Sequence, residues 1–121
     1  MPARVLVVDD EPAVLHLVAG ALESRGYEVH TAGGPLAALD LVRKAKPCFD
    51  VLVSDVVMPE MCGPELARNV IRMCPRSAVV LMSGHIAGEG LPYGARFLSK
   101  PFLVSDLYRA VEMALASSGP S

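Results

Sequence analysis

The sequence predicts an α/β protein in which a parallel β-sheet is covered by helices on both faces. Three observations lead to this prediction. Short runs rich in valine and leucine alternate with longer runs whose apolar residues recur at helical spacing. The short runs are apolar almost throughout, as strands buried on both faces are. Glycine or proline stands at many of the boundaries between the two kinds of run.

Each element follows from its own residues in chain order. After a first apolar run, Pro12 suits the first turn of a helix that Gly26 ends. Later prolines start and end the next helices in the same way, and we expect Ser105 to cap the last helix. The expected strands are residues 4–8, 27–32, 50–54, 77–83 and 94–99. The expected helices lie within residues 12–26, 33–47, 63–75 and 103–118. The buried stripe of the last helix is expected to consist of Leu107, Val111, Ala114 and Leu115.

The connection between the fourth and fifth expected strands is the exception to the alternation. Its sequence, "GHIAGEGLPYGA", carries four glycines and one proline and has little helical character. Any fourth helix in this place is therefore expected to be short or absent.

Length and composition indicate one compact domain. A chain of 121 residues suits a single core, which we place at residues 1–117, followed by a flexible tail at residues 118–121. No apolar stretch approaches the roughly 20 residues that a membrane helix needs. The N-terminal apolar run is too short for a signal peptide, so we expect a cytoplasmic protein without membrane contact. The chain has no cluster of lysine and arginine, which argues against direct nucleic-acid binding.

The three cysteines, Cys48, Cys62 and Cys74, are odd in number and lack CxxC spacing. A zinc site requires four close nitrogen or sulfur ligands, which this pattern does not provide. We therefore expect three free thiols, buried or half-buried, in a reducing compartment.

Charged and polar residues gather where the expected strands end. Asp9 and Asp10 follow the first strand, Asp55 ends the third, Ser83 ends the fourth and Lys100 follows the fifth. The carboxyl ends of parallel strands share one edge of the sheet, where ligands of such sheets bind. Three carboxylates, one hydroxyl and one ammonium group are thus expected to converge.

This set of groups has a physical logic. Three close carboxylates repel one another, and a hard divalent cation such as Mg²⁺ relieves that repulsion. A carboxylate also acts as a nucleophile toward phosphorus and forms an aspartyl phosphate. Lysine and hydroxyl groups are suitable partners for the oxygens of a transferring phosphoryl group.

Four segments, "VVDDEP", "DVVMPEMCG", "LMSG" and "FLSKPF", resemble the receiver domains of two-component response regulators, including chemotaxis receivers. Each segment alone is a weak motif, but all four occur in order, at strand ends, across essentially the whole chain. The resemblance implies a doubly wound, flavodoxin-like sheet of five parallel strands in the order 2-1-3-4-5.

The resemblance also implies roles for individual residues in a phosphorelay. The domain would accept a phosphoryl group from the phosphohistidine of a sensor histidine kinase or phosphotransfer protein, with Mg²⁺ as cofactor. It would catalyse only its own phosphorylation and dephosphorylation, as a signalling phosphoacceptor. The implied phosphoacceptor is Asp55, and the implied metal ligands are Asp9, Asp10, Asp55 and the Val57 carbonyl. Ser83 and Lys100 would bind the phosphoryl group. Ser83 and Phe97 would form the switch that responds to phosphorylation. The Lys100–Pro101 peptide bond would be cis.

Some of these positions carry more than one interpretation. Phe97 lies in an expected strand, where an aromatic side chain is commonly part of the core. His85 lies two positions after Ser83, where an ordinary structural or exposed histidine is the default. Our hypothesis is that His85, together with the apolar Val57, sets the lifetime of the aspartyl phosphate.

The chain departs from the family pattern in one respect. The interval between Ser83 and Lys100 is several residues shorter than usual, and the missing length falls in the fourth helix. In this respect the sequence looks more like receivers attached to hybrid histidine kinases. The surface that often carries dimer contacts is affected, so the oligomeric state stays open.

Other protein classes fit less well. A phosphatase resembling the haloacid dehalogenase family would carry a second acid two residues after the nucleophile, where this chain has Val57. A degenerate receiver that only binds proteins would have lost part of the acidic and basic set. A flavin-binding protein would carry a hydroxyl-rich phosphate loop after the first strand, where this chain has acids.

Overall fold

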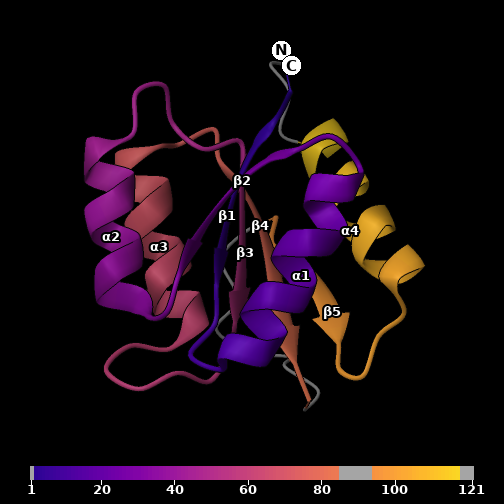
Figure 1. Ribbon diagram of the computed structural model, residues 1–121. Helices are drawn as coiled ribbons and strands as arrows, with labels where there is room; N and C mark the ends of the chain where they lie inside the picture. The colour runs from indigo at the N-terminus through magenta and orange to yellow at the C-terminus, as the bar shows by residue number, and fades with distance from the viewer. Residues whose placement is uncertain (1, 85–93, 118–121) are drawn as a thin grey trace.

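The computed structural model describes residues 2–84 and 94–117. Within these ranges, five strands and four helices form three layers, with the sheet in the middle (Figure 1). The strands are β1 (Arg4–Val8), β2 (Glu28–Ala32), β3 (Val51–Asp55), β4 (Ala78–Ser83) and β5 (Arg96–Ser99). The helices are α1 (Pro12–Ser24), α2 (Pro35–Lys44), α3 (Gly63–Met73) and α4 (Val104–Ser117).

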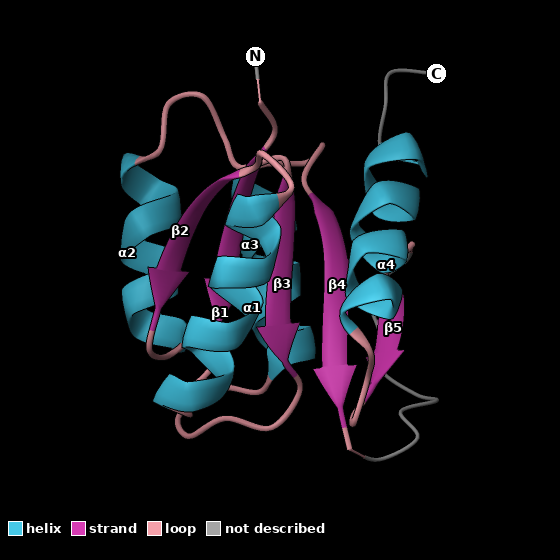
Figure 2. Ribbon diagram, turned by 45° about the vertical axis from the view of Figure 1, so that its right-hand side comes forward, coloured by secondary structure: helices cyan, strands magenta, loops and turns pink. Residues whose placement is uncertain are grey.

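All neighbouring strands are parallel, and the sheet has the order β2-β1-β3-β4-β5. The predicted strand order is therefore confirmed. β3 lies at the centre of the sheet, between β1 and β4. The arrowheads of the strands point to one edge in Figure 2, so this edge collects the residues that end each strand.

The alternation of side chains along the strands divides the core in two. Leu6 and Val8 of β1 pack with residues of α2 and α3, whereas Val5 and Val7 pack with residues of α1 and α4. Figure 1 shows the two helix pairs on opposite sides of the sheet. Both faces of the sheet are therefore buried, which explains why the strands are apolar without the polar alternation of a half-exposed strand.

A fourth helix is present, and it is the C-terminal helix α4, which follows β5. The expectation of a short or absent helix concerned the segment between β4 and β5, of which residues 85–93 lie outside the described residues. The prediction that Ser105 caps the last helix is wrong, because α4 begins at Val104. Instead, the Asp106 carboxylate accepts a hydrogen bond from the backbone N–H of Leu103 at 3.0 Å.

The prediction of three free thiols is wrong for two of the cysteines. Cys48 and Cys74 form a disulfide, with 6.0 Å between their Cα atoms, whereas Cys62 is free and exposed. Sequence spacing could not reveal this pair, because it depends on where the end of α3 lies relative to the loop before β3. Among the described residues, no helix has the length and apolar character needed to cross a membrane.

Candidate functional site

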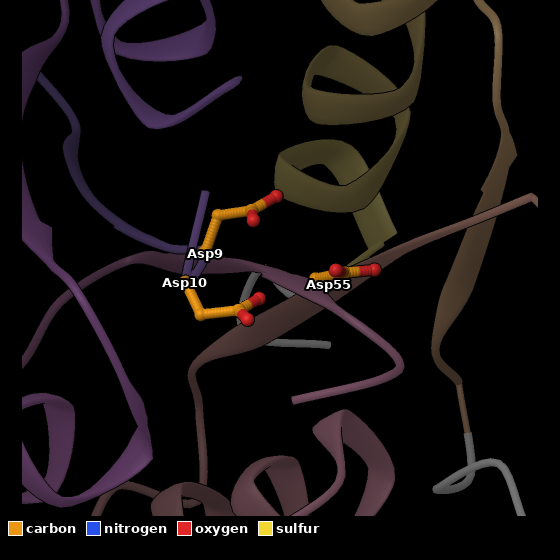
Figure 3. A group of neighbouring side chains, drawn as sticks. All are labelled: Asp9, Asp10 and Asp55. Atoms are coloured by element: carbon orange, nitrogen blue, oxygen red, sulfur yellow. The ribbon is translucent and has the colours of Figure 1, made fainter. Parts of the chain in front are cut away.

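β1 and β3 bring the predicted acids together at the carboxyl edge of the sheet. Val8 pairs with Ser54 across the two strands, so Asp9 and Asp55, which follow them, lie next to each other. Asp10 comes directly after Asp9. Figure 3 shows the carboxylates of Asp9 and Asp10 directed to the side on which Asp55 lies. One oxygen atom from each of the three carboxylates lies within 4.8 Å of the other two.

The three acids differ in their access to water. Asp9 is fully buried, Asp55 is 8 % exposed, and Asp10 is on the surface. The Oδ1 atom of Asp9 accepts a hydrogen bond of 2.9 Å from the backbone N–H of Glu11. Its Oδ2 atom has no hydrogen-bond partner among the described residues. A buried carboxylate oxygen in this state is costly unless a cation approaches it.

Lys100 supplies one positive charge to this site. Its Nζ atom lies 3.4 Å from Oδ1 of Asp55 and 3.5 Å from Oδ2 of Asp9. The backbone positions the side chain, since Lys100 N–H donates a 2.7 Å hydrogen bond to the carbonyl of Ser83 at the end of β4. The Lys100–Pro101 peptide is cis, as the resemblance implies.

The electrostatic balance of the site leaves negative charge uncompensated. Burial raises the pKa of the Asp55 carboxyl, and the nearby charge of Asp9 raises it further. The Lys100 ammonium group and a hydrogen bond from the backbone N–H of Val57 oppose these effects, but the pKa remains above its ordinary value. The oxygen donors, their spacing and the negative charge that the single lysine does not offset fit a hard divalent cation such as Mg²⁺.

The first turn of α3 packs directly on the end of β3. The backbone N–H of Gly63 donates a 2.7 Å hydrogen bond to the Val56 carbonyl. A β-carbon at position 63 would lie 2.3 Å from the carbonyl oxygen of Asp55, so only glycine allows this approach. The hydroxyl group of Ser54, which is also buried, donates a 2.9 Å hydrogen bond to the carbonyl of Asp55. Sequence reasoning missed both contacts, since no motif indicates which backbone atom a loop glycine or a strand serine will meet.

The remaining predicted residues that the structure describes lie in β4, in β5 and in the loop after β3, and they differ in how far they are buried. Ser83 is buried at the end of β4, where it pairs in register with Ser99 of β5. Val57 lies in the loop after β3 with 66 % of its surface exposed. Phe97 is half-buried in β5 and packs against the core cluster on the α2 and α3 face. His85 lies outside the described residues.

A three-layer α/β fold with three acids and a lysine at the carboxyl edge is the arrangement that the receiver-like motifs of the sequence predict. Residues 5–112 match the family model of the response regulator receiver domain. The chain therefore belongs to the response regulator receiver domain family, as its motifs predict.

Individual relatives agree with this assignment. The chain is 40 % identical over 118 residues to the sensor kinase CckA of Brucella abortus (strain 2308), covering 93 % of this chain but only 12 % of that kinase. It is 31 % identical over 120 residues to the response regulator receiver protein CpdR of the same organism, covering 95 % of this chain and 98 % of CpdR. A crystal structure of the receiver domain from the hybrid histidine kinase CckA superimposes with a TM-score of 0.83 at 34 % identity, covering 93 % of this chain and 99 % of that domain. The predicted similarity to receivers of hybrid kinases is thus confirmed.

Proposed function

We propose that this domain accepts a phosphoryl group on Asp55 from the phosphohistidine of a sensor histidine kinase or phosphotransfer protein, in a reaction that requires Mg²⁺. The observation that carries the proposal is the position of Asp55. Its carboxylate lies within 3.4 Å of the Lys100 ammonium group and within 4.8 Å of the acids Asp9 and Asp10. A carboxylate in this setting has a cation beside it and an oxygen available for attack on phosphorus.

Each residue then has a defined task. An oxygen of Asp55 forms a bond to phosphorus while the bond from phosphorus to the donor's imidazole nitrogen breaks, and that nitrogen keeps the electron pair. Lys100 places its positive charge against the phosphoryl oxygens, and the Ser83 hydroxyl donates to one of them. Asp9, Asp10 and the backbone carbonyl of Val57 would hold Mg²⁺, which offsets negative charge on the transferring group when bound. The domain thereby modifies itself and acts as a cytoplasmic signalling element, without a separate turnover substrate.

The structural change caused by phosphorylation would extend from the site along β4 and β5. Ser83 at the end of β4 moves toward the phosphoryl group, and this movement alters the packing of Phe97 on the neighbouring strand β5. The altered surface near Phe97 is read by a protein partner, without direct contact to nucleic acid or membrane. This step rests on the adjacency of the two strands, in which Leu81 pairs with Phe97 and Ser83 with Ser99.

Incubation of the purified chain with acetyl phosphate and Mg²⁺ tests the phosphoacceptor role. We expect intact-mass spectrometry to show one added phosphoryl group, and peptide mapping to place it on Asp55. The Asp55→Asn variant should remain unmodified, whereas the matched control Asp40→Asn, an exposed acid of α2, should react like the wild type. Absence of any adduct on Asp55, with both acetyl phosphate and beryllofluoride as probes, overturns the proposal.

We also propose that Val57 and His85 set the lifetime of the aspartyl phosphate. The side chain of Val57 is largely exposed in the loop after Asp55, where an apolar group restricts the approach of water. Replacing it by a polar group should therefore speed hydrolysis severalfold. The measurement is the decay of phosphorylated chain after removal of the phosphodonor, for Val57→Asn, His85→Ala and the control Leu36→Asn, an exposed apolar residue of α2. Decay rates equal to the wild type in both test variants contradict this role.

A further inference from the structure

We propose that the Cys48–Cys74 disulfide is a reversible redox modification site, and that its state controls how firmly α3 is held against the strand that carries Asp55. The bond joins the loop before β3 to the residue after α3, across 26 positions of the sequence. The covalent ring that it closes contains β3, Asp55 and all of α3. The bond itself lies at the amino edge of the sheet, roughly 15 Å from the acids by the length of β3.

α3 is held at both of its ends and along its length. At its start, Gly63 lies against the carbonyl of Asp55 and donates a hydrogen bond to Val56. Along its length, Leu66, Ala67 and Val70 are buried in the core. At its end, the disulfide fixes the chain to the loop before β3. Opening the bond therefore releases one end of the helix whose other end touches the Asp55 backbone.

The fold does not depend on the disulfide alone at this edge. Phe49, next to Cys48, is buried, and its carbonyl accepts a 2.6 Å hydrogen bond from the hydroxyl of Ser77. Asp50 N–H donates a 2.8 Å hydrogen bond to the Arg4 carbonyl, which ties the start of β3 to β1. We therefore expect the reduced chain to stay folded, with a looser end of α3 rather than global unfolding.

The disulfide is accessible and lies in positive surroundings. Cys48 is exposed, whereas Cys74 is buried. Two surface hollows meet at the bond: Arg43 and Lys46 line one, and Arg76 lines the other together with Asp50. Nearby cations stabilise thiolates. They would favour both the thiolate that attacks the disulfide and the thiolate that leaves it.

The reactant that fits is a small or protein-borne dithiol. Its first thiolate attacks Sγ of Cys48 and forms a mixed disulfide, while Cys74 leaves as a thiolate and takes up a proton. The second thiol of the reductant then displaces Cys48, so that two electrons and two protons pass to the protein and the reductant becomes a disulfide. In a reducing compartment the bond would be open. A small or protein-borne disulfide would close it by the reverse exchange, in which it accepts two electrons and two protons and becomes a dithiol.

Thiol alkylation of the native chain tests whether the bond is a modification site. The Cys62→Ser variant removes the third thiol, so that only the paired cysteines take up iodoacetamide. We expect no alkyl group on the oxidised chain, and one on the exposed Cys48 after treatment with dithiothreitol without denaturant. After reoxidation with oxidised glutathione we expect no alkyl group and no retained glutathione. Alkylation that requires denaturant, or a reduced chain that does not reoxidise, overturns the proposal.

Hydrogen exchange followed by mass spectrometry tests the effect on α3. Peptides from the last turns of α3 should exchange severalfold faster in the reduced chain, while peptides covering β1 remain unchanged. The variant Cys48→Ser should resemble the reduced chain and should not respond to dithiothreitol. Equal exchange of α3 in the oxidised and reduced chains overturns the control of α3. Neither measurement uses a phosphodonor, so its outcome is independent of phosphoryl transfer to Asp55.

Discussion

The position of Asp55 in the folded protein is energetically unfavourable for its carboxylate. Its carboxylate is almost fully buried, close to the charge of Asp9, and has one lysine beside it. A structural carboxylate placed for stability would be solvated or fully paired. The surroundings of Asp55 are therefore typical of a functional site, where carboxyl groups with shifted pKa values commonly occur, and not of a residue that stabilises the fold.

We expect Asp55→Asn to stabilise the chain when divalent cations are removed. The pKa of Asp55 is raised in the folded state, so the ionised form costs free energy. In acid, below the pKa that Asp55 has in the unfolded chain, the carboxyl group is protonated in both states and this cost is absent. The wild type loses stability as the pH rises through the pKa that Asp55 has in the folded state. At neutral pH the variant should be more stable by roughly 1–3 kcal/mol, the scale of a poorly compensated buried polar group.

Urea denaturation in the presence of a chelator, between acid and neutral pH, measures this difference. Asp40→Asn serves as the control, because Asp40 is an exposed acid of α2 outside the acidic site and its replacement should change stability little. An Asp55→Asn variant that is less stable than the wild type at neutral pH contradicts the prediction.

At the scale of elements, the contact between α3 and β3 sets the geometry behind Asp55. The helix can approach the strand because position 63 has no side chain, and the apolar stripe of α3 then fills the space beyond. The same helix ends at the disulfide. The backbone around β3 is therefore joined to α3 at both ends of the helix.

We expect Gly63→Ala to destabilise the chain by roughly 1–3 kcal/mol, the cost of overpacking a close contact. The added carbon would meet the Asp55 carbonyl at 2.3 Å, so helix and strand must move apart. Chemical denaturation midpoints measure the effect. The control is Gly20→Ala in α1, where nothing lies within 4 Å, and where alanine should be neutral or stabilising. Equal losses in the two variants would show that the close approach has no energetic importance.

At the scale of the whole molecule, the sequence predicts the sheet well because burial on both faces leaves a clear signal. The apolar runs around Val7 and Val53 locate strands, and the acids after them locate the edge at which they meet. The disulfide and the Gly63 contact could not be predicted, because both depend on the orientation of α3 against the sheet. That orientation is decided by packing between distant residues, which leaves no local pattern.

The formal charge of the acidic site equals the formal net charge of the entire protein. Three carboxylates and one ammonium group, from Asp9, Asp10, Asp55 and Lys100, leave two negative charges in one place. The whole chain has a formal net charge of −2, so all other charged side chains cancel one another. A single divalent cation at this site would make the molecule formally neutral. Binding of one such ion would therefore change the force that the molecule exerts on an approaching anion.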